Sequence, residues 1–240
     1  MDDPSGCSAL IVAGGSGQRM GGSTRKQFLL LDGEAILKHT LQAFDRHPRV
    51  HALVVVLPKE EHAAREQQIR RQWGMHKPLA IVVGGEERQT SVQNGLHALS
   101  QDGGLVLVHD GVRPLVSAQL IDRVIESARI NGAAVPGLPV RETVKEIGDG
   151  WVHRTLMRQN LVAVQTPQGF RIDILRAAYE QAKARNLSAT DDSALVEELG
   201  VRVAIVDGEE QNIKITTRAD LAIAEWWLLQ EKKDAHRSGI

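Results

Sequence analysis

Short apolar runs recur along the 240-residue chain, and segments with helical periodicity separate them. The central runs are apolar at nearly every position, which is typical of strands covered on both faces in a parallel sheet. This order predicts a layered α/β fold with a mostly parallel sheet. The expected strands are 9–12, 52–57, 80–83, 105–109, 133–135 and 201–206. The expected helices are 34–44, 59–72, 91–99, 117–130, 173–185, 191–199 and 219–230.

Two stretches depart from this rhythm. Within 137–166, the alternating segments VRETVKEI and WVHRTLMR flank Gly148-Asp149-Gly150, a turn signal that predicts a projecting β-hairpin arm. A hairpin alone is marginally stable in water, so an arm of this length gains by packing on another subunit, and we expect a homodimer. The charged end, 231–240, lacks periodicity and is expected to be disordered. A single domain is expected over 1–236, with the arm inside it.

Charge and composition argue against nucleic-acid-binding, membrane and disulfide-bonded secreted proteins. Lys and Arg number 29 against 30 Asp and Glu, and aromatic residues make up 3%, so neither a basic field nor stacking platforms for nucleic acid are expected. No apolar run approaches the roughly 18 residues of a membrane span. The single cysteine, Cys7, can form no internal disulfide, and the acidic N-terminus is unlike a signal peptide. We expect a soluble, cytoplasmic protein that binds neither nucleic acid nor membrane.

The first expected strand leads into a glycine-rich loop, LIVAGGSGQRM at 10–20. Glycine amides can approach an anion without a Cβ in the way, so Gly14, Gly15 and Gly17 predict a phosphate site. Arg19 and Lys26 strengthen this interpretation, because two cations beside the loop would repel each other unless an anion lay between them. The alternative is a plain flexible turn.

The loop does not fit the two commonest phosphate motifs. A P-loop requires Lys-Ser or Lys-Thr after its last glycine, whereas Lys26 is followed by Gln27. The Rossmann fingerprint requires Gly-x-Gly-x-x-Gly, and Gly15, Gly17 and Gly21 have another spacing. The second expected strand also ends in Leu-Pro-Lys, without an acid for the ribose. An NAD enzyme is therefore a weak alternative.

Five motifs follow one another along the chain: AGGSGQRM with KQF, GGEERQTSVQNGL, VHDGVRP, QTPQGF and NIKIT. In order and spacing they resemble the 2-C-methyl-D-erythritol 4-phosphate cytidylyltransferases of the non-mevalonate isoprenoid pathway, from about Ala9 to Trp227. The resemblance implies a Rossmann-like three-layer nucleotidyltransferase fold and an enzyme that joins CTP to methylerythritol 4-phosphate and releases pyrophosphate.

Two alternatives stay open. Ribitol-5-phosphate cytidylyltransferase shares the fold, the glycine loop and the Asp-x-x-Arg-Pro element, although ERQTSVQNGL and RQNLVAVQTPQGF look more like the isoprenoid enzymes. A nucleotide-binding regulator that has lost catalysis is the other.

The resemblance implies that cations neutralise the phosphates of CTP while backbone groups and a serine bind the nucleotide. Glu86 departs from the family, which often has Asp there, and Ser91 also fits as the N-cap of the helix it opens. The implied catalytic residues are Arg19, Lys26 and Lys214. The implied nucleotide contacts are Ala13, Gly14, Gly15, Gly17, Gly85, Glu86 and Ser91.

Asp110 ends an expected strand, where open α/β sheets place their ligands. A carboxylate there is an expected ligand of Mg²⁺ on the α-phosphate, and the alternative is a structural acid paired with Arg113. Val112 departs from the small residue that the family often has. The implied contacts of the sugar phosphate are Asp110, Arg113, Thr143, Arg158, Thr166, Thr190 and Asp191, of which Thr143 and Arg158 reach in from the partner subunit.

Overall fold

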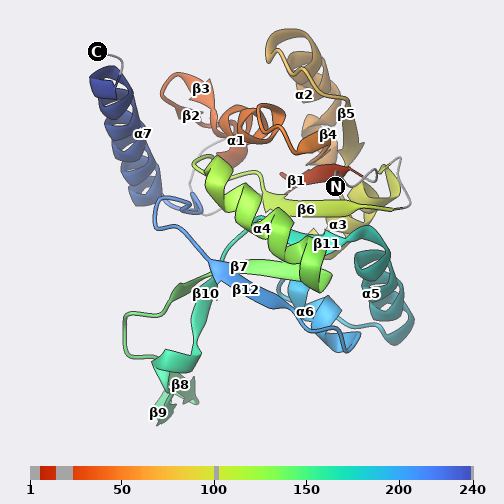
Figure 1. The fold of residues 1–240 in the computed structure, drawn as a ribbon, viewed down its shortest axis with the longest axis vertical. Coiled ribbons are helices and arrows are strands. Elements are labelled where there is room, and N and C mark those ends of the chain that lie inside the picture. Colours follow the sequence, from red (N-terminus) through yellow and green to blue (C-terminus); the bar gives the residue numbers. More distant parts are fainter. Residues whose placement is uncertain (1–5, 15–23, 100–102, 239–240) are drawn as a thin grey trace.

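The computed structural model describes residues 6–14, 24–99 and 103–238, with side chains up to Lys233. Its main feature is an eight-stranded sheet with the order β10-β7-β11-β6-β1-β4-β5, in which β12 also pairs with β7 (Figure 1). β1, β4, β5 and β6 are mutually parallel, whereas β10 and β11 run antiparallel to their neighbours. The strands are β1 (Cys7–Val12), β4 (Val50–Leu57), β5 (Leu79–Val83), β6 (Leu105–Asp110), β7 (Ala133–Pro139), β10 (Val162–Val164), β11 (Gln168–Arg171) and β12 (Ala204–Asp207).

Helices cover both faces of this sheet (Figure 1). Successive residues of β1 point to opposite faces, so Ile11 packs with one cluster of buried side chains and Leu10 with another. The first cluster includes α1 (Ile36–Asp45), α2 (Lys59–Gln72) and α4 (Ala118–Asn131). The second includes α3 (Arg88–His97), α5 (Ile172–Arg185) and α6 (Asp192–Glu198). The three-layer α/β fold with a mostly parallel sheet is thus confirmed, and its central strands are apolar on both sides for this reason.

Several short elements were not expected from the sequence. They are η2 (Lys26–Phe28), β2 (Leu30–Leu31), β3 (Glu34–Ala35), η3 (Arg158–Asn160), β10 and β11. β11 contains a glycine and two polar residues, and its pairing with β6 and β7 comes from tertiary contacts rather than from an apolar pattern.

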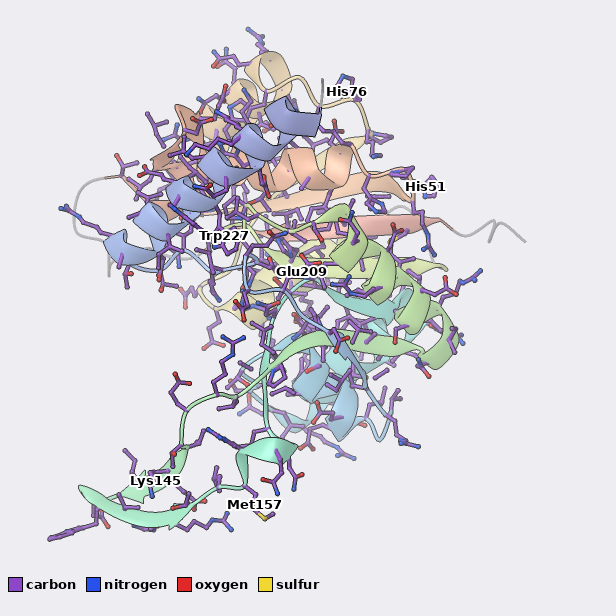
Figure 2. All side chains as sticks on the ribbon, turned by 60° about the vertical axis from the view of Figure 1, so that its left-hand side comes forward. His51, His76, Lys145, Met157, Glu209 and Trp227 are labelled. Atoms are coloured by element: carbon purple, nitrogen blue, oxygen red, sulfur yellow. The ribbon has the colours of Figure 1, made fainter. Side chains whose placement is uncertain are left out.

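The predicted arm is present and projects from the body of the molecule (Figures 1 and 2). β8 (Lys145–Gly148) pairs antiparallel with β9 (Trp151–Thr155). Asp149 and Gly150 both have positive φ, 51° and 81°, as a tight hairpin turn requires. Trp151 is 77% exposed and Ile147 is 72% exposed, although both are large and apolar. The arm therefore presents apolar surface that its own subunit leaves uncovered.

The last helix, α7 (Arg218–Ser238), is longer than expected. It packs Leu221 and Trp227 against a third apolar cluster that contains Ile215, and Lys232 forms an ion pair with Asp32. The expectation of a disordered end over 231–240 is thus wrong as far as Ser238, because the charged residues continue a helix anchored by tertiary contacts. Within the described residues, no helix is long and apolar enough to cross a membrane.

Candidate functional site

The candidate site lies where four parallel strands end together. Val12 is in register with Val56 and Asp110, and Leu57 with Val83, so the segments after β1, β4, β5 and β6 meet at one edge of the sheet. A pocket of about 690 Å³ opens there. Its lining includes the sequence-predicted residues Ala13, Gly14, Lys26, Gly85, Glu86, Ser91, Asp110 and Lys214.

Three glycines surround the buried Ser91 in this pocket. The Ser91 hydroxyl accepts a hydrogen bond from the Gly85 N–H at 3.1 Å and donates one to the Glu87 carbonyl at 2.9 Å. A Cβ on Gly84 would lie 2.9 Å from the Ser91 oxygen, and one on Gly14 would lie 3.1 Å from it. Positions 14 and 84 therefore favour glycine, because the segments that follow β1 and β5 pack directly on Ser91.

Ser91 itself lies inside α3, which begins at Arg88. The expectation that it caps the helix is wrong, because the chain turns into the helix one turn earlier. The N-cap is Glu87, which makes no side-chain capping bond.

Lys26 reaches the pocket from the short helix η2, whose neighbours anchor it. The Gln27 side chain is buried and donates to the Ala13 carbonyl at 2.6 Å. Phe28 enters the core, where the guanidinium of Arg65 lies 4.2 Å from the centre of its ring. Arg25, also in the pocket lining, pairs with Glu60 at 2.8 Å. Packing of residues 25–28 thus places Lys26 in the pocket lining together with Gly14.

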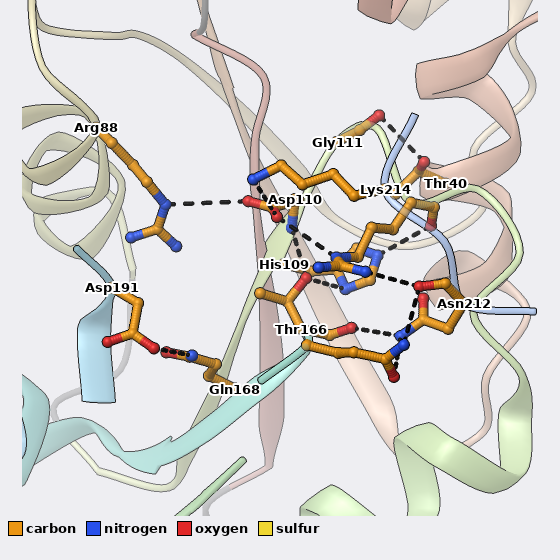
Figure 3. A network of polar contacts seen from close by, with 12 residues as sticks. Thr40, Arg88, His109, Asp110, Gly111, Thr166, Gln168, Asp191, Asn212 and Lys214 are labelled. Carbon is orange, nitrogen blue, oxygen red and sulfur yellow. Dashed lines mark hydrogen bonds and ion pairs between the residues drawn. The ribbon is translucent and has the colours of Figure 1, made fainter. Parts of the chain in front are cut away.

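Asp110 is the centre of a cluster of cations (Figure 3). Its carboxylate lies 2.9 Å from Lys214 Nζ, 3.5 Å from Arg113 Nε and 3.9 Å from Arg88 Nε. Burial by itself would raise the pKa of Asp110, but Lys214 and the two arginines outweigh it and lower that pKa to about 2. Arg88 also pairs with Asp192 at 2.6 Å, and two carboxylates with three cations still leave the cluster net positive, which suits a phosphate-rich ligand.

A second layer of polar groups lies behind Asp110. Thr166 is buried, and its hydroxyl accepts from the Asp110 N–H at 3.1 Å. The ring of His109 is fully buried, and burial lowers its pKa to about 4. Asn212 joins this layer, because its side chain donates to the Thr166 carbonyl at 2.8 Å and its carbonyl accepts from Arg113 at 2.7 Å. Arg113 and Thr166 therefore contact Asp110 from behind and are outside the described lining of the pocket.

Arg88 is a pocket residue that the sequence analysis did not single out. Its guanidinium pairs with Asp192 at 2.6 Å, and the Tyr179 hydroxyl donates to the same carboxylate at 2.6 Å. Burial would lower the pKa of Arg88, but the fully buried Asp192 outweighs it and raises that pKa. Arg88 belongs to the motif GGEERQTS, which was a usable signal. Nothing in the sequence pointed to Asp192, which is 104 positions away.

The other predicted residues lie farther out. Asp191 caps α6, where it accepts from the Ala194 N–H at 3.0 Å and from Gln168 at 2.7 Å, and Thr190 beside it is exposed. Thr143 and Arg158 are exposed on the arm and are outside the described lining of their own subunit's pocket. Gly15, Gly17 and Arg19 lie outside the described residues.

The described residues contain no group of three or more His, Cys, Asp or Glu side chains that could hold a metal ion by themselves. The site does fit a Mg²⁺ ion held by one carboxylate together with substrate phosphates, a common arrangement for this ion. Asp110 faces the pocket and stays ionised at neutral pH, as such a ligand must. The ion pair with Arg113, which was the alternative interpretation of Asp110, is present, and the role as a Mg²⁺ ligand stays a prediction.

Comparison with known proteins gives consistent matches. The family model of 2-C-methyl-D-erythritol 4-phosphate cytidylyltransferase matches residues 7–230. The enzyme of that name from Pelotomaculum thermopropionicum is 50% identical over 220 residues, which cover 91% of this chain and 92% of the relative. The Geobacter metallireducens enzyme of the same name is 44% identical over 226 residues, which cover 93% and 97%.

Two solved structures share the fold. The 4-diphosphocytidyl-2C-methyl-D-erythritol synthase of Anaerococcus prevotii superposes with a TM-score of 0.82 at 33% identity, covering 95% of this chain and all of that one. The 2-C-methyl-D-erythritol 4-phosphate cytidylyltransferase of Thermus thermophilus superposes with a TM-score of 0.72 at 37% identity, covering 92% and 98%. The similarity thus extends over nearly the whole chain in both sequence and fold.

Proposed function

Because the chain belongs to the 2-C-methyl-D-erythritol 4-phosphate cytidylyltransferase family, we propose that its pocket at the carboxyl edge of the sheet is the active site. The enzyme transfers a cytidylyl group from CTP to 2-C-methyl-D-erythritol 4-phosphate, giving 4-CDP-2-C-methyl-D-erythritol and pyrophosphate, in isoprenoid precursor biosynthesis. The observation that carries the assignment of the site is the net positive cluster around Asp110 beside a glycine-lined pocket.

The reaction requires few chemical groups from the protein. A phosphate oxygen of the sugar alcohol attacks the α-phosphorus of CTP in line; the new P–O bond forms as the bond to the oxygen bridging the α- and β-phosphates breaks, and pyrophosphate leaves. The attacking oxygen is already anionic at neutral pH, so no general base is needed. Catalysis then consists of holding two mutually repelling phosphates together and stabilising charge as it develops.

The cations of the pocket have separate roles in this proposal. Lys26 on η2 and Lys214 beside Asp110 bind the phosphates of CTP from two sides, and Arg19 adds a third positive charge. Asp110 would hold Mg²⁺, which would supply further positive charge to the phosphates of CTP. Ser91 and the backbone of 84–86 bind the cytosine ring, while the loop of Ala13, Gly14, Gly15 and Gly17 faces the triphosphate.

We assign the sugar phosphate to the other side of Asp110. Arg113, Thr166, Thr190 and Asp191 come from the same subunit in this assignment, and Thr143 and Arg158 come from the arm of a second subunit. The exposed apolar side chains on the arm support a homodimer, since a partner surface would cover them. We also propose that residues 1–236 form a single nucleotidyltransferase domain. We propose a cytoplasmic location, because Cys7 is the chain's single cysteine and is buried and unpaired.

The direct test is pyrophosphate release by the purified chain with CTP, Mg²⁺ and methylerythritol 4-phosphate. Ribitol 5-phosphate in place of methylerythritol 4-phosphate is the matched control, and a preference for it would move the assignment to the related cytidylyltransferase. Binding of CTP without turnover on either sugar phosphate would instead indicate a regulator. Removing Mg²⁺ with a chelator should abolish turnover if the reaction needs the ion that Asp110 would hold.

The dimer can be tested by complementation between two variants, assayed at a methylerythritol 4-phosphate concentration low enough that neither variant alone is active. Lys26→Ala damages a subunit's own pocket, whereas Arg158→Ala damages the arm that would serve the partner's pocket. Coexpression of the two should restore about a quarter of wild-type activity, because half of randomly formed dimers are mixed and each mixed dimer has one intact site. Coexpression of Lys26→Ala with Lys214→Ala is the control and should restore nothing, since both residues line the same subunit's pocket.

A further inference from the structure

His109 is a fully buried histidine that the reaction described above does not use. It lies on β6 immediately before Asp110, with its ring centre 4.9 Å from that of Phe44. Both ring nitrogens have polar partners: Nε2 lies 3.1 Å from the Arg113 carbonyl, and Nδ1 lies 3.1 Å from the Thr166 hydroxyl (Figure 3). A buried polar side chain with two such partners connects parts of the site that are separate in sequence.

The partners determine the direction of each hydrogen bond. The Arg113 carbonyl can only accept, so Nε2 carries the ring hydrogen and donates it. Nδ1 is then the accepting nitrogen of a neutral ring, and the Thr166 hydroxyl donates to it. The same hydroxyl oxygen accepts from the Asp110 N–H at 3.1 Å. A continuous chain of hydrogen bonds thus runs from the carbonyl of Arg113 through His109 and Thr166 to the backbone of Asp110.

We propose that His109 is a positioning residue that holds both ends of the Asp110–Arg113 turn and thereby keeps the Asp110 carboxylate directed into the pocket with Arg113 behind it. The turn is closed by the Arg113 N–H, which donates to the Asp110 carbonyl at 3.0 Å. His109 contacts one end of the turn directly and the other through Thr166. This role rests on the proposed function of the pocket, since it concerns the placement of Asp110 and Arg113 there.

Two conservative variants separate the two contacts. The side-chain oxygen of asparagine falls near the place of Nδ1, so His109→Asn keeps an acceptor for Thr166. The side-chain nitrogen of glutamine falls near the place of Nε2, so His109→Gln keeps a donor for the Arg113 carbonyl. His109→Ala removes both contacts. Leu175→Ala, a fully buried change in the opposite layer, is the control for lost stability alone.

We expect His109→Ala to lower kcat by about tenfold or more, as displacement of reacting groups does, with KM for CTP changed less than about twofold. The Asn and Gln variants should each recover part of that kcat. Leu175→Ala should lower the melting temperature without lowering kcat. The role is overturned if kcat of His109→Ala equals that of the wild type, or if neither conservative variant exceeds the alanine variant.

A double-mutant cycle tests the connection through Thr166. Thr166→Val removes the hydroxyl. At saturating sugar phosphate, where a lost substrate contact acts on KM, it should lower kcat in the wild-type background, but by less than about twofold when His109 is already alanine. If Thr166→Val lowered kcat by the same factor in both backgrounds, the connection from His109 to Asp110 through Thr166 would be overturned. Inactivity of the wild-type chain with CTP and methylerythritol 4-phosphate would overturn the proposed function and this role together, whereas an active wild type with an equally active His109→Ala overturns only the role.

Discussion

Replacing Asp110 with asparagine tests the charge balance of the site most directly. The side chain keeps its size but loses the negative charge that faces Lys214, Arg113 and Arg88. The fold lowers the pKa of Asp110 from 3.8 to about 2. A change of that size corresponds to about 2 kcal/mol of folding free energy at pH 7. The carboxylate is only 10% exposed, so solvent screens this contribution little.

We therefore expect Asp110→Asn to lower the free energy of unfolding by about 2 kcal/mol at pH 7, measured by urea denaturation. Because the folded-state pKa lies below the unfolded one, the wild-type advantage is complete above pH 3.8 and disappears as the pH falls through about 2. Subtracting the variant's pH profile from the wild type's removes the contributions of other carboxylates.

Activity and anion binding should change in opposite directions in this variant. Mg²⁺-dependent turnover should be lost, whereas CTP without Mg²⁺ should bind at least as tightly, because the cation cluster keeps its charges without the competing carboxylate. Asp173→Asn is the matched control: Asp173 also pairs with an arginine, Arg171, but both are 56% exposed, so its loss should cost less than about 1 kcal/mol. Equal stability losses for the two variants, or Mg²⁺-dependent turnover by Asp110→Asn, would refute the reasoning.

Three further changes separate the roles of other groups. Lys26→Ala should lower kcat by the equivalent of about 3 kcal/mol, a typical loss for one electrostatic stabiliser, in pyrophosphate-release assays; an effect confined to KM would contradict this. Arg158→Ala should raise KM for methylerythritol 4-phosphate while calorimetric binding of CTP stays unchanged, and unaltered kinetics would remove Arg158 from the site. Gly85→Ala should weaken CTP binding, because its Cβ would lie 2.4 Å from the Thr90 side chain. Gly74→Ala is the control: Gly74 has open space around it but a φ of 63°, so this variant should lose stability and keep CTP binding intact.

The arm shows which features can be predicted from neighbouring residues and which cannot. Its hairpin was predictable because alternation and the Gly148-Asp149-Gly150 turn are properties of neighbouring residues, and the turn has the positive φ values that such residues tolerate. Whether the arm meets a partner is decided by surfaces that no local pattern describes. Likewise, the end of α7 was misjudged because this helix packs Trp227 and Leu228 on a cluster that contains Leu31, from a distant part of the chain.

The sequence by itself determined the order of the main strands and helices, since burial on two faces imposes its own apolar pattern. It also singled out Gly14, Gly85 and Asp110, which meet in one pocket because parallel strands align their carboxyl ends. Lys26 from η2 and Lys214 from the segment between β12 and α7 line the same pocket through tertiary packing. Only the tertiary structure decided which groups support them. Arg88 with Asp192, and His109 with Thr166, meet through strand register and helix packing, and those depend on how distant side chains fit together rather than on the residues near each of them in the chain.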